Sequence, residues 1–345
     1  MSKKIKMLNR KVIFITGGTG SFGSSLCKYL LKNYSPKKII IFSRDELKQY
    51  ELRKQLKKSS KTKLRFFIGD VRDLQRLNVA MTEADIVVHA AALKQVDAAE
   101  YNPFEAIKTN IIGAQNVITA CLNNNVKHVM ALSTDKACSP ANLYGSTKLA
   151  SDKLFISANN IKGKNKCKFS VIRYGNVMFS RGSVIPYFLK LKKNNFKLPV
   201  TDRDMTRFSL TLTESIQFVL KSIEMMTGGE LFVPKISSYR IMDLVKAISP
   251  KSKIQVTGIR PGESTAIYID TILTRLTTIG AIYLTLVALL PEFLLSKTSI
   301  PFYLGGTSLL IVVVVMIDFI TQIQSYLFQH QYEGLLKKTK LKGRR

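Results

Sequence analysis

Residues 16–23 read Thr16-Gly17-Gly18-Thr19-Gly20-Ser21-Phe22-Gly23, and this stretch decides the fold. It follows a short apolar run at 12–16 and leads into a helical pattern that begins at Ser24. Glycines at this spacing allow a tight turn, a close approach of the backbone to a pyrophosphate, and close packing of helix on strand. The unpaired amides at the start of the helix would then face the anion. Because a strand precedes the glycines and a helix follows them, we predict a dinucleotide-binding loop.

Short apolar runs alternate with helical stretches on either side of this loop. The runs lie at 12–16, 38–42, 64–69, 86–89, 129–133 and 169–174, and the helical stretches include 24–32, 46–57, 103–123 and 144–159. Nearly continuous apolar strands separated by helices indicate a parallel sheet covered on both faces. We therefore predict an α/β, Rossmann-like, doubly wound domain over 1–175. A small substrate-binding lobe, interleaved with that domain, is expected over 176–265.

The composition excludes several classes of protein. Of the 345 residues, 46% are hydrophobic, so the chain is not disordered. With 53 Lys and Arg against 23 Asp and Glu, the formal charge is +30, which can indicate a nucleic-acid or anionic-membrane partner. The lysines are scattered and form no stripe interleaved with aromatic residues, so we predict no nucleic-acid partner. The four cysteines lack metal-ligand spacing, and we expect buried free thiols and no metal.

The composition changes abruptly near residue 270. The segments 276–295 and 304–320 each carry one charge, Glu292 and Asp318. A helix needs about 20 apolar residues to cross a bilayer, so we predict a transmembrane hairpin over 276–320, within a C-terminal unit at 270–345. A pair of buried core helices is the alternative. The basic tail should remain cytoplasmic, which places the N-terminal region in the cytoplasm, tethered to the inner membrane.

The end of the second strand bears on the choice between NAD and NADP. An acidic residue there would hold the ribose 2′-hydroxyl, whereas Arg accommodates a 2′-phosphate. Arg44 and Lys48 favour NADP, whereas Asp45 leaves NAD as the alternative and also suits a helix cap. Asp70 and Val71 end the third strand, where the adenine would lie. The predicted cofactor-binding residues are Gly17, Thr19, Gly20, Ser21, Phe22, Gly23, Arg44, Asp45, Lys48, Asp70, Val71, Ala91, Tyr144 and Lys148.

Candidate catalytic residues follow the fifth strand. Tyr144 and Lys148 are four residues apart and share one helical face. A nearby ammonium favours phenolate, so we predict a lowered pKa for Tyr144 and a role as base near neutral pH. Asp135 and Lys136 place a carboxylic acid beside an amine, which supplies a proton donor and a base for an elimination. On local sequence alone, Lys136 is equally well a solvated turn residue.

These residues lie in a sequence that resembles the extended short-chain dehydrogenases/reductases. More closely, it resembles the inverting UDP-N-acetylglucosamine 4,6-dehydratases of pseudaminic-acid biosynthesis. The resemblance covers about residues 7–263 and rests on the runs ITGGTGSFG, FSRDELKQ, FFIGDVRDL, HAAALKQV, LSTDKA, NLYGSTK, RYGNV, SRGSVIP, MTRF and GIRPGE. In that family, dehydratases that retain configuration have Asp-Glu in place of Asp135-Lys136, and simple 4-epimerases lack the pair.

The resemblance implies a mechanism and a set of contacts. Tyr144, assisted by Lys148 and Thr134, would deprotonate the sugar 4-hydroxyl while hydride passes from C4 to NADP. Asp135 would protonate the departing 6-hydroxyl, and Lys136 would remove the C5 proton. Implied substrate contacts are Lys94, Asn176, Arg181, Arg207, Arg260 and Glu263. The helices at 103–123 and 144–159 would form a homo-oligomer interface. His89 is expected to be a hydrogen-bonded residue at a strand end.

From about Gly258, and clearly by Tyr268, the chain instead resembles the C-terminal end of SecY, the channel subunit of the Sec translocon. The resemblance rests on TAIYIDTILTRLTTIGAIYLTLVALLPEF, IPFYLGGTSLLIVVVVMIDFITQIQ and QYEGLLKKTKLKG. It implies two membrane helices, a cytoplasmic tail and a truncated substrate lobe, because dehydratases continue past GIRPGE in soluble form. Two alternatives to an active dehydratase follow. One is a catalytically impaired cofactor-binding fusion, and the other is a translocon fragment with an enzyme passenger.

Overall fold

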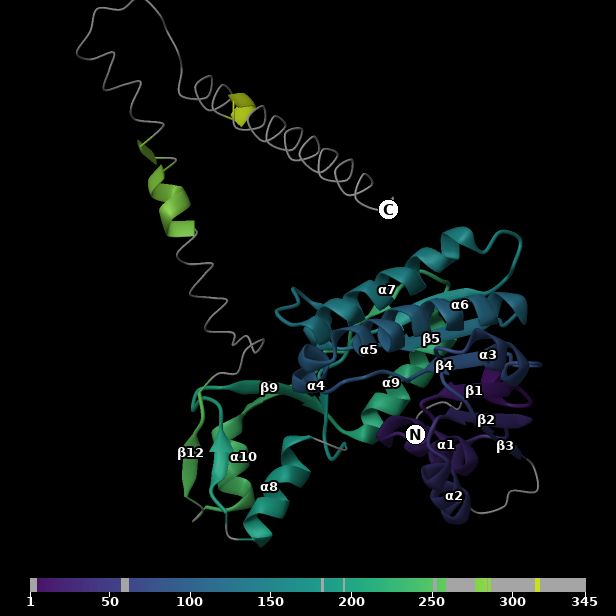
Figure 1. Cartoon of the computed structure of the whole chain (residues 1–345), viewed down its shortest axis with the longest axis horizontal. Coiled ribbons are helices and arrows are strands. Elements are labelled where there is room, and N and C mark those ends of the chain that lie inside the picture. Colours follow the sequence, from purple (N-terminus) through teal and green to yellow (C-terminus); the bar gives the residue numbers. More distant parts are fainter. Residues whose placement is uncertain are drawn as a thin grey trace, which may run out of the picture. The chain divides into compact units, whose positions relative to one another are not determined.

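The structure, a computed structural model, describes residues 5–56, 62–180, 183–194, 196–250, 253–258, 277–283, 285–286 and 314–316. The chain divides into two compact units, Met1–Thr265 and Ala266–Arg345 (Figure 1). In the second unit, the described residues are helical. The predicted hairpin at 276–320 lies mostly outside the described residues. Within the described ranges, no helix combines the length and the apolar character needed to cross a bilayer.

A parallel sheet forms the centre of the first unit. In the described part of the chain it has seven strands, in the order β10-β6-β5-β4-β1-β2-β3. The strands are β1 (Val12–Thr16), β2 (Lys38–Ser43), β3 (Lys63–Ile68), β4 (Ile86–His89), β5 (His128–Leu132), β6 (Lys168–Ile172) and β10 (Leu231–Phe232). The predicted α/β, doubly wound architecture is confirmed. The six strands expected from the sequence lie within two residues of their predicted bounds.

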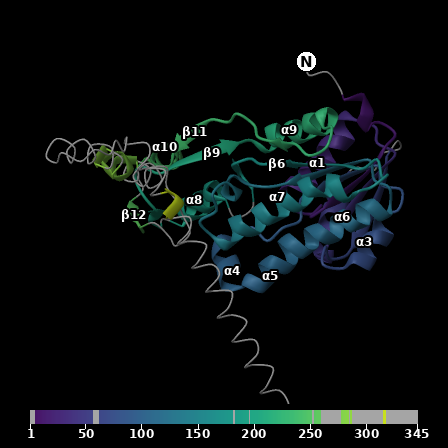
Figure 2. The same cartoon turned by 90° about the horizontal axis from the view of Figure 1, so that it is seen from above.

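Helices cover both faces of this sheet (Figure 2). They are α1 (Ser21–Asn33), α2 (Glu46–Gln55), α3 (Leu74–Ala80), α4 (Val96–Tyr101), α5 (Pro103–Ile107), α6 (Gly113–Asn123), α7 (Leu143–Ile161) and α9 (Leu212–Met225). Successive side chains of a strand point to opposite faces, so β1 contributes to two apolar cores. Val12 and Phe14 share one core with α3, α6 and α7. Ile13 and Ile15 share the other with α1, α2 and α9.

A smaller lobe is built from the segments on either side of α9. Its elements are β7 (Asn176–Val177), α8 (Val184–Lys193), β8 (Leu198–Val200), β9 (Thr206–Leu210), β11 (Ser238–Arg240), α10 (Ile241–Ile248) and β12 (Ile254–Val256). The strands form two small sheets, β11-β9-β7 and β12-β8. Phe188, Leu198 and Val245 belong to a separate apolar core that holds this lobe together.

Three features of the elements differ from the sequence prediction. The last strand of the sheet, β10, lies between the two chain segments that form the lobe and pairs with β6, although the sequence analysis places all strands of the sheet before residue 175. Two residues are too few for a periodic pattern to reveal a strand. Helix α1 begins at Ser21 rather than at Ser24. The helix expected over 103–123 contains the π-helical turn η2 (Lys108–Ile112) between α5 and α6.

Candidate active site

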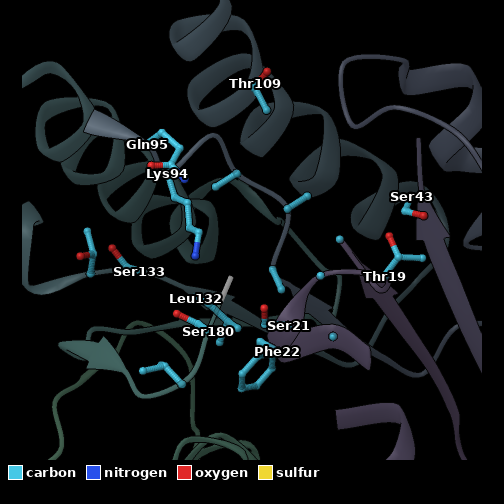
Figure 3. Close-up of a pocket in the computed structure, with 18 of the residues that line it drawn as sticks. Thr19, Ser21, Phe22, Ser43, Lys94, Gln95, Thr109, Leu132, Ser133 and Ser180 are labelled. Atoms are coloured by element: carbon cyan, nitrogen blue, oxygen red, sulfur yellow. The ribbon is translucent and has the colours of Figure 1, made fainter. Parts of the chain in front are cut away.

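A cleft of about 590 Å³ opens at the carboxyl ends of the central strands. In doubly wound sheets, ligands bind at this edge, where the strand order reverses between β1 and β4. Every residue predicted to bind the cofactor lines the cleft: Gly17, Thr19, Gly20, Ser21, Phe22, Gly23, Arg44, Asp45, Lys48, Asp70, Val71, Ala91, Tyr144 and Lys148. Figure 3 shows part of this lining, with Ser21 and Phe22 on the glycine-rich loop.

The glycine-rich loop fits a pyrophosphate. Gly17 has φ +63°, and a Cβ on it would lie 2.9 Å from the Ala90 backbone. A Cβ on Gly23 would lie 2.6 Å from the Gly17 carbonyl oxygen, so the start of α1 packs directly on the loop. Gly20 is the N-cap of α1, and no side chain caps the helix there. The first-turn amides of α1 therefore face the cleft without a capping side chain, as anion binding requires.

Carboxylates pair with the cations predicted to select the cofactor. Asp45 caps α2 by accepting a hydrogen bond from the Lys48 amide at 2.9 Å, and it also forms an ion pair with the Lys48 ammonium. The predicted capping role of Asp45 is thus confirmed. Arg44 Nη1 lies 3.5 Å from Asp70 Oδ2, which also accepts a hydrogen bond from Arg72 Nη2 at 2.8 Å. Burial opposes ionisation of Asp70, but the bonds from Arg72 hold its pKa below the usual value.

The predicted acid and amine lie together in the short turn η3 (Asp135–Ala137) that follows β5. Lys136 Nζ donates to Asp135 Oδ1 at 3.2 Å, and the Thr134 hydroxyl donates to the same oxygen at 2.9 Å. The Asp135 amide donates to the Tyr174 carbonyl oxygen at 3.1 Å, which fixes the turn against the chain that follows β6. The side chains of Asp135 and Lys136 are one-third exposed, and Lys136 lines the cleft. The pair is therefore accessible to a bound substrate.

Helix α7 brings Tyr144 and Lys148 to the same place. Asn142 caps the helix by accepting a hydrogen bond from the Gly145 amide at 2.7 Å. Tyr144 is hydrogen-bonded to the Thr134 side chain. One turn later, the buried Lys148 ammonium donates to the Leu132 carbonyl oxygen at 2.8 Å. Both side chains line the cleft.

The predicted lowering of the Tyr144 pKa is wrong for the protein alone. Burial raises the pKa of Tyr144 to about 12, which outweighs the hydrogen bond with Thr134, and the charges of Asp135 and Asp152 act in the same direction as burial. Burial also lowers the pKa of Lys148, although Asp152 opposes this. The four-residue spacing shows that Tyr144 and Lys148 share a helical face. It does not show that both side chains are buried, and burial is what shifts their pKa values.

The predicted substrate contacts divide into three groups. Lys94 and Asn176 line the cleft. Figure 3 shows the Lys94 amino group directed into the cleft, toward Leu132 and Ser133, and burial lowers the pKa of Lys94. Arg207 lies on β9 opposite Tyr239 and is not part of the cleft lining. The remaining predicted contacts, Arg181, Arg260 and Glu263, lie outside the described residues.

Two cleft residues escaped the sequence analysis. The hydroxyls of Thr109 and Ser133 are buried, and neither has a hydrogen-bond partner among the described residues. Buried hydroxyls are normally paired, so these two are suited to a bound ligand. Ser133 lies within the run LSTDKA and was open to detection. Thr109 lies on η2, and no pattern in the sequence signals that turn.

Two further expectations concern residues near the cleft. His89 accepts or donates a hydrogen bond with Thr16 Oγ1 at 2.8 Å, so its predicted role as a hydrogen-bonded strand-end residue is confirmed. Burial, with a smaller effect of Lys148, lowers its pKa to about 3. Cys27, Cys121 and Cys167 are buried as expected, but Cys138 is exposed because it follows the η3 turn at the surface.

The chain is similar to proteins of sugar-nucleotide metabolism. A sequence profile of polysaccharide biosynthesis proteins matches residues 13–275. The UDP-N-acetylglucosamine 4,6-dehydratase (inverting) of Campylobacter jejuni is 58% identical over 258 residues, 74% of this chain and 76% of the relative. A UDP-glucose 4-epimerase of Rickettsia bellii is 45% identical over 260 residues, 73% of this chain and 75% of the relative.

A solved structure gives the same picture of the fold. Pen from Bacillus thuringiensis is 39% identical, with a TM-score of 0.71, and the match covers 75% of this chain and 83% of that one. These comparisons give no support to the predicted translocon resemblance of the region beyond residue 275.

Proposed function

Since this chain belongs to the family of polysaccharide biosynthesis proteins, we propose that it is an inverting UDP-N-acetylglucosamine 4,6-dehydratase. The product would be a UDP-linked 4-keto-6-deoxy-hexosamine with inverted configuration at C5, a precursor of surface or flagellar glycans. One observation carries this proposal. Lys136 lines the cleft beside Thr134 and Tyr144, and it contacts Asp135 at 3.2 Å. A simple 4-epimerase has no use for such a pair.

We propose NADP as the cofactor. The loop at 17–23 and the N-terminus of α1, which no side chain caps, fit its pyrophosphate. Arg44 and Lys48 offer positive charges for a 2′-phosphate. A phosphate would compete with Asp70 and Asp45 for these cations, so NAD is the alternative. When bound, the cofactor supplies a reversible hydride acceptor for C4 and a donor for C6, with no net oxidation.

Tyr144 is the base for the first step. It accepts the proton of the sugar 4-hydroxyl, and Thr134 holds its phenol by a hydrogen bond. Because burial raises the pKa of Tyr144 to about 12, a positive charge must assist, and the Lys148 ammonium is one helical turn away. The resulting 4-ketone acidifies the proton on C5.

Asp135 and Lys136 then remove water. A proton that passes from Lys136 to Asp135 along their contact turns the ion pair into a carboxylic acid and a free amine. The amine accepts the C5 proton, and the acid protonates the 6-hydroxyl, which leaves as water. A proton from solvent delivered to the opposite face of C5, with the hydride that a bound cofactor would supply at C6, would give the inverted product.

The test is to incubate the purified chain with UDP-N-acetylglucosamine and NADP and to follow the sugar by NMR. A 4-keto-6-deoxy product that incorporates deuterium at C5 in heavy water supports the proposal. Formation of the 4-epimer would show an epimerase instead. Cofactor binding without turnover would favour the impaired cofactor-binding fusion.

We also propose a homo-oligomer that forms through the helices at 103–123 and 144–159. Tyr101 and Phe104, at the start of this layer, are 89% and 74% exposed, which is unusual for aromatic side chains of a monomer. Replacing both residues by Ser should shift the chain to a smaller species in light scattering. An unchanged mass would contradict this interface.

The C-terminal region supports a separate proposal on location. Residues 276–320 carry few charges, and we propose that they tether a cytoplasmic enzyme to the inner membrane, as the translocon-like sequence predicts. Fractionation of the full chain and of a chain ending at residue 265 tests this. Both chains in the soluble fraction would contradict the tether.

A further inference from the structure

A buried ion pair lies behind the catalytic helix. Asp152 is on α7, four residues after Lys148 and eight after Tyr144, so the three residues share one helical face. Its Oδ2 accepts a hydrogen bond from Arg173 Nε at 2.8 Å. The side chains of Asp152 and Arg173 are 2% and 16% exposed. Charges withdrawn from water to this degree interact strongly with their neighbours.

Arg173 is itself fixed by the sheet. It follows β6, and its amide donates to the Phe232 carbonyl oxygen of β10 at 2.9 Å. The next residue, Tyr174, is partly buried, lines the cleft and accepts the hydrogen bond from the Asp135 amide through its carbonyl oxygen. The Asp152–Arg173 pair therefore joins α7 to the segment that supports the catalytic turn.

Lys148 depends on this pair for its charge. Its side chain is buried, and its ammonium donates to the Leu132 carbonyl oxygen. A neutral carbonyl does not compensate a full charge that has lost its water. Asp152 is the carboxylate that favours the ammonium form of Lys148. Arg173 is paired with Asp152, so its positive charge offsets part of that carboxylate's field.

Other titratable groups also face this cluster. Lys94 lines the same cleft and directs its amino group toward Leu132, whose carbonyl oxygen binds Lys148. His89 on β4 is neutral because its pKa is about 3, and Tyr174 is a partly buried phenol. Asp135 and Lys136 of the η3 turn face Tyr144 from the open side of the cleft and carry opposite charges. On the buried side of Lys148, Asp152 and Arg173 form the charged pair nearest along α7 and β6.

We propose that Asp152 and Arg173 are positioning residues that set the electrostatic potential at Lys148 and Tyr144, and with it the pH range in which the site works. This inference rests on the proposed dehydratase activity. Asp152 keeps Lys148 charged, and Arg173 limits the negative field so that Tyr144 still loses its proton.

Opposite changes of charge give opposite predictions. Asp152→Asn removes a negative charge. In a plot of kcat against pH, the rise on the acidic side and the fall on the basic side should both move to lower pH by about one unit. Arg173→Met removes a positive charge, so the rise and the fall should both move to higher pH by a similar amount. If the Asp152–Arg173 pair had only a structural role, both variants would have a lower maximal kcat, and the pH values at which kcat rises and falls would not change. Asp243→Asn, on the exposed surface of α10, controls for net charge and should leave the profile unmoved.

Conservative variants separate charge from folding. Asp152→Glu and Arg173→Lys keep the charges. The pH values at which kcat rises and falls should therefore match those of the wild type within error, even if the Tm of the variant is lower. Two results would overturn the proposal. One is a shift of the pH profile of kcat in Asp152→Glu and Arg173→Lys, and the other is a shift in the same direction in Asp152→Asn and Arg173→Met.

A second readout does not need turnover. In protein with isotope-labelled lysine, the Lys148 resonance is identified by its loss in Lys148→Met, and its titration is followed by NMR. Asp152→Asn should lower this pKa and Arg173→Met should raise it. If the wild type has no dehydratase activity, the proposed function fails, but these titrations still decide the inference. Unchanged titrations in both variants would refute it.

Discussion

Gly145 lies against the backbone of Lys136, so closely that a Cβ at position 145 would meet the Lys136 carbonyl oxygen at 2.2 Å. The first turn of α7, which carries Tyr144, therefore rests directly on the turn that carries the acid–amine pair. Lys136 and Tyr144, eight residues apart in sequence, hold a fixed relative position because only glycine fits at the contact between the two turns.

Gly145→Ala should separate Tyr144 from Asp135 and Lys136. A displacement of about 1 Å in an active site can reduce kcat about 100-fold, and we expect a loss of this size with NADP binding retained. Turnover and cofactor titration measure the two effects. Gly163→Asn is the matched control, because Gly163 has open space around it and Asn tolerates its φ of +56°. Wild-type turnover in Gly145→Ala would contradict the tight contact.

Lys136→Met should abolish elimination while NADP still binds. Removal of a general base typically costs a factor of 10² to 10⁴, and we expect about that loss in product formation by NMR. Lys153→Met, an exposed lysine on α7, is the control and should retain activity. If Lys136→Met still exchanges the C5 proton at the wild-type rate, another group is the base.

Arg44→Ala should weaken NADP more than NAD. A hydrogen bond to a charged group contributes about 1.5–3 kcal/mol. The Kd for NADP should therefore rise about 10-fold to 100-fold, and the Kd for NAD should change little. Calorimetry with each dinucleotide measures this difference. Arg65→Ala, an exposed arginine on β3, should change neither affinity. Equal losses for NAD and NADP would show that Arg44 does not contact a 2′-phosphate.

His89 should make the folded state sensitive to acid. Its pKa is about 3 when folded, against 6.5 in the unfolded chain, so between these values the unfolded chain binds the extra proton. Stability is therefore complete above about pH 6.5 and falls with pH, by at most about 1.4 kcal/mol per unit from this residue. Urea denaturation at several pH values should show a shallower fall for His89→Asn than for the wild type. Parallel curves would contradict this assignment.

The parts of the site that depend on local sequence were open to prediction. The glycine loop, the Tyr144–Lys148 spacing and the Asp135–Lys136 pair each depend on residues close together in the chain. The structure brings the loop, Tyr144, Lys148 and Lys136 to one cleft, with Asp135 bonded to Lys136. The strand order follows from apolar runs that are long enough to show a pattern. A two-residue strand such as β10 leaves no such pattern.

Other properties depend on what the fold packs around a residue. The raised pKa of Tyr144 reflects burial, which no spacing reveals. Thr109 reaches the cleft through the π-helical turn, where Asn110 accepts a hydrogen bond from the Leu93 amide at 2.9 Å and so orders the segment before Lys94. Arg207 matches a family motif and lies on β9 opposite Tyr239, and the cleft lining does not include it. Long-range packing decides each of these outcomes.

The position of β10 has a consequence for synthesis on the ribosome. The edge of β6 has no neighbour on that side until Leu231 and Phe232 have been translated, which requires the whole segment from β7 to α9 to emerge first. The nascent N-terminal domain thus exposes an open strand edge for some sixty codons, a template for unwanted strand pairing. The lobe is completed later still, because its sheets need β11 and β12, which follow β10 in the chain.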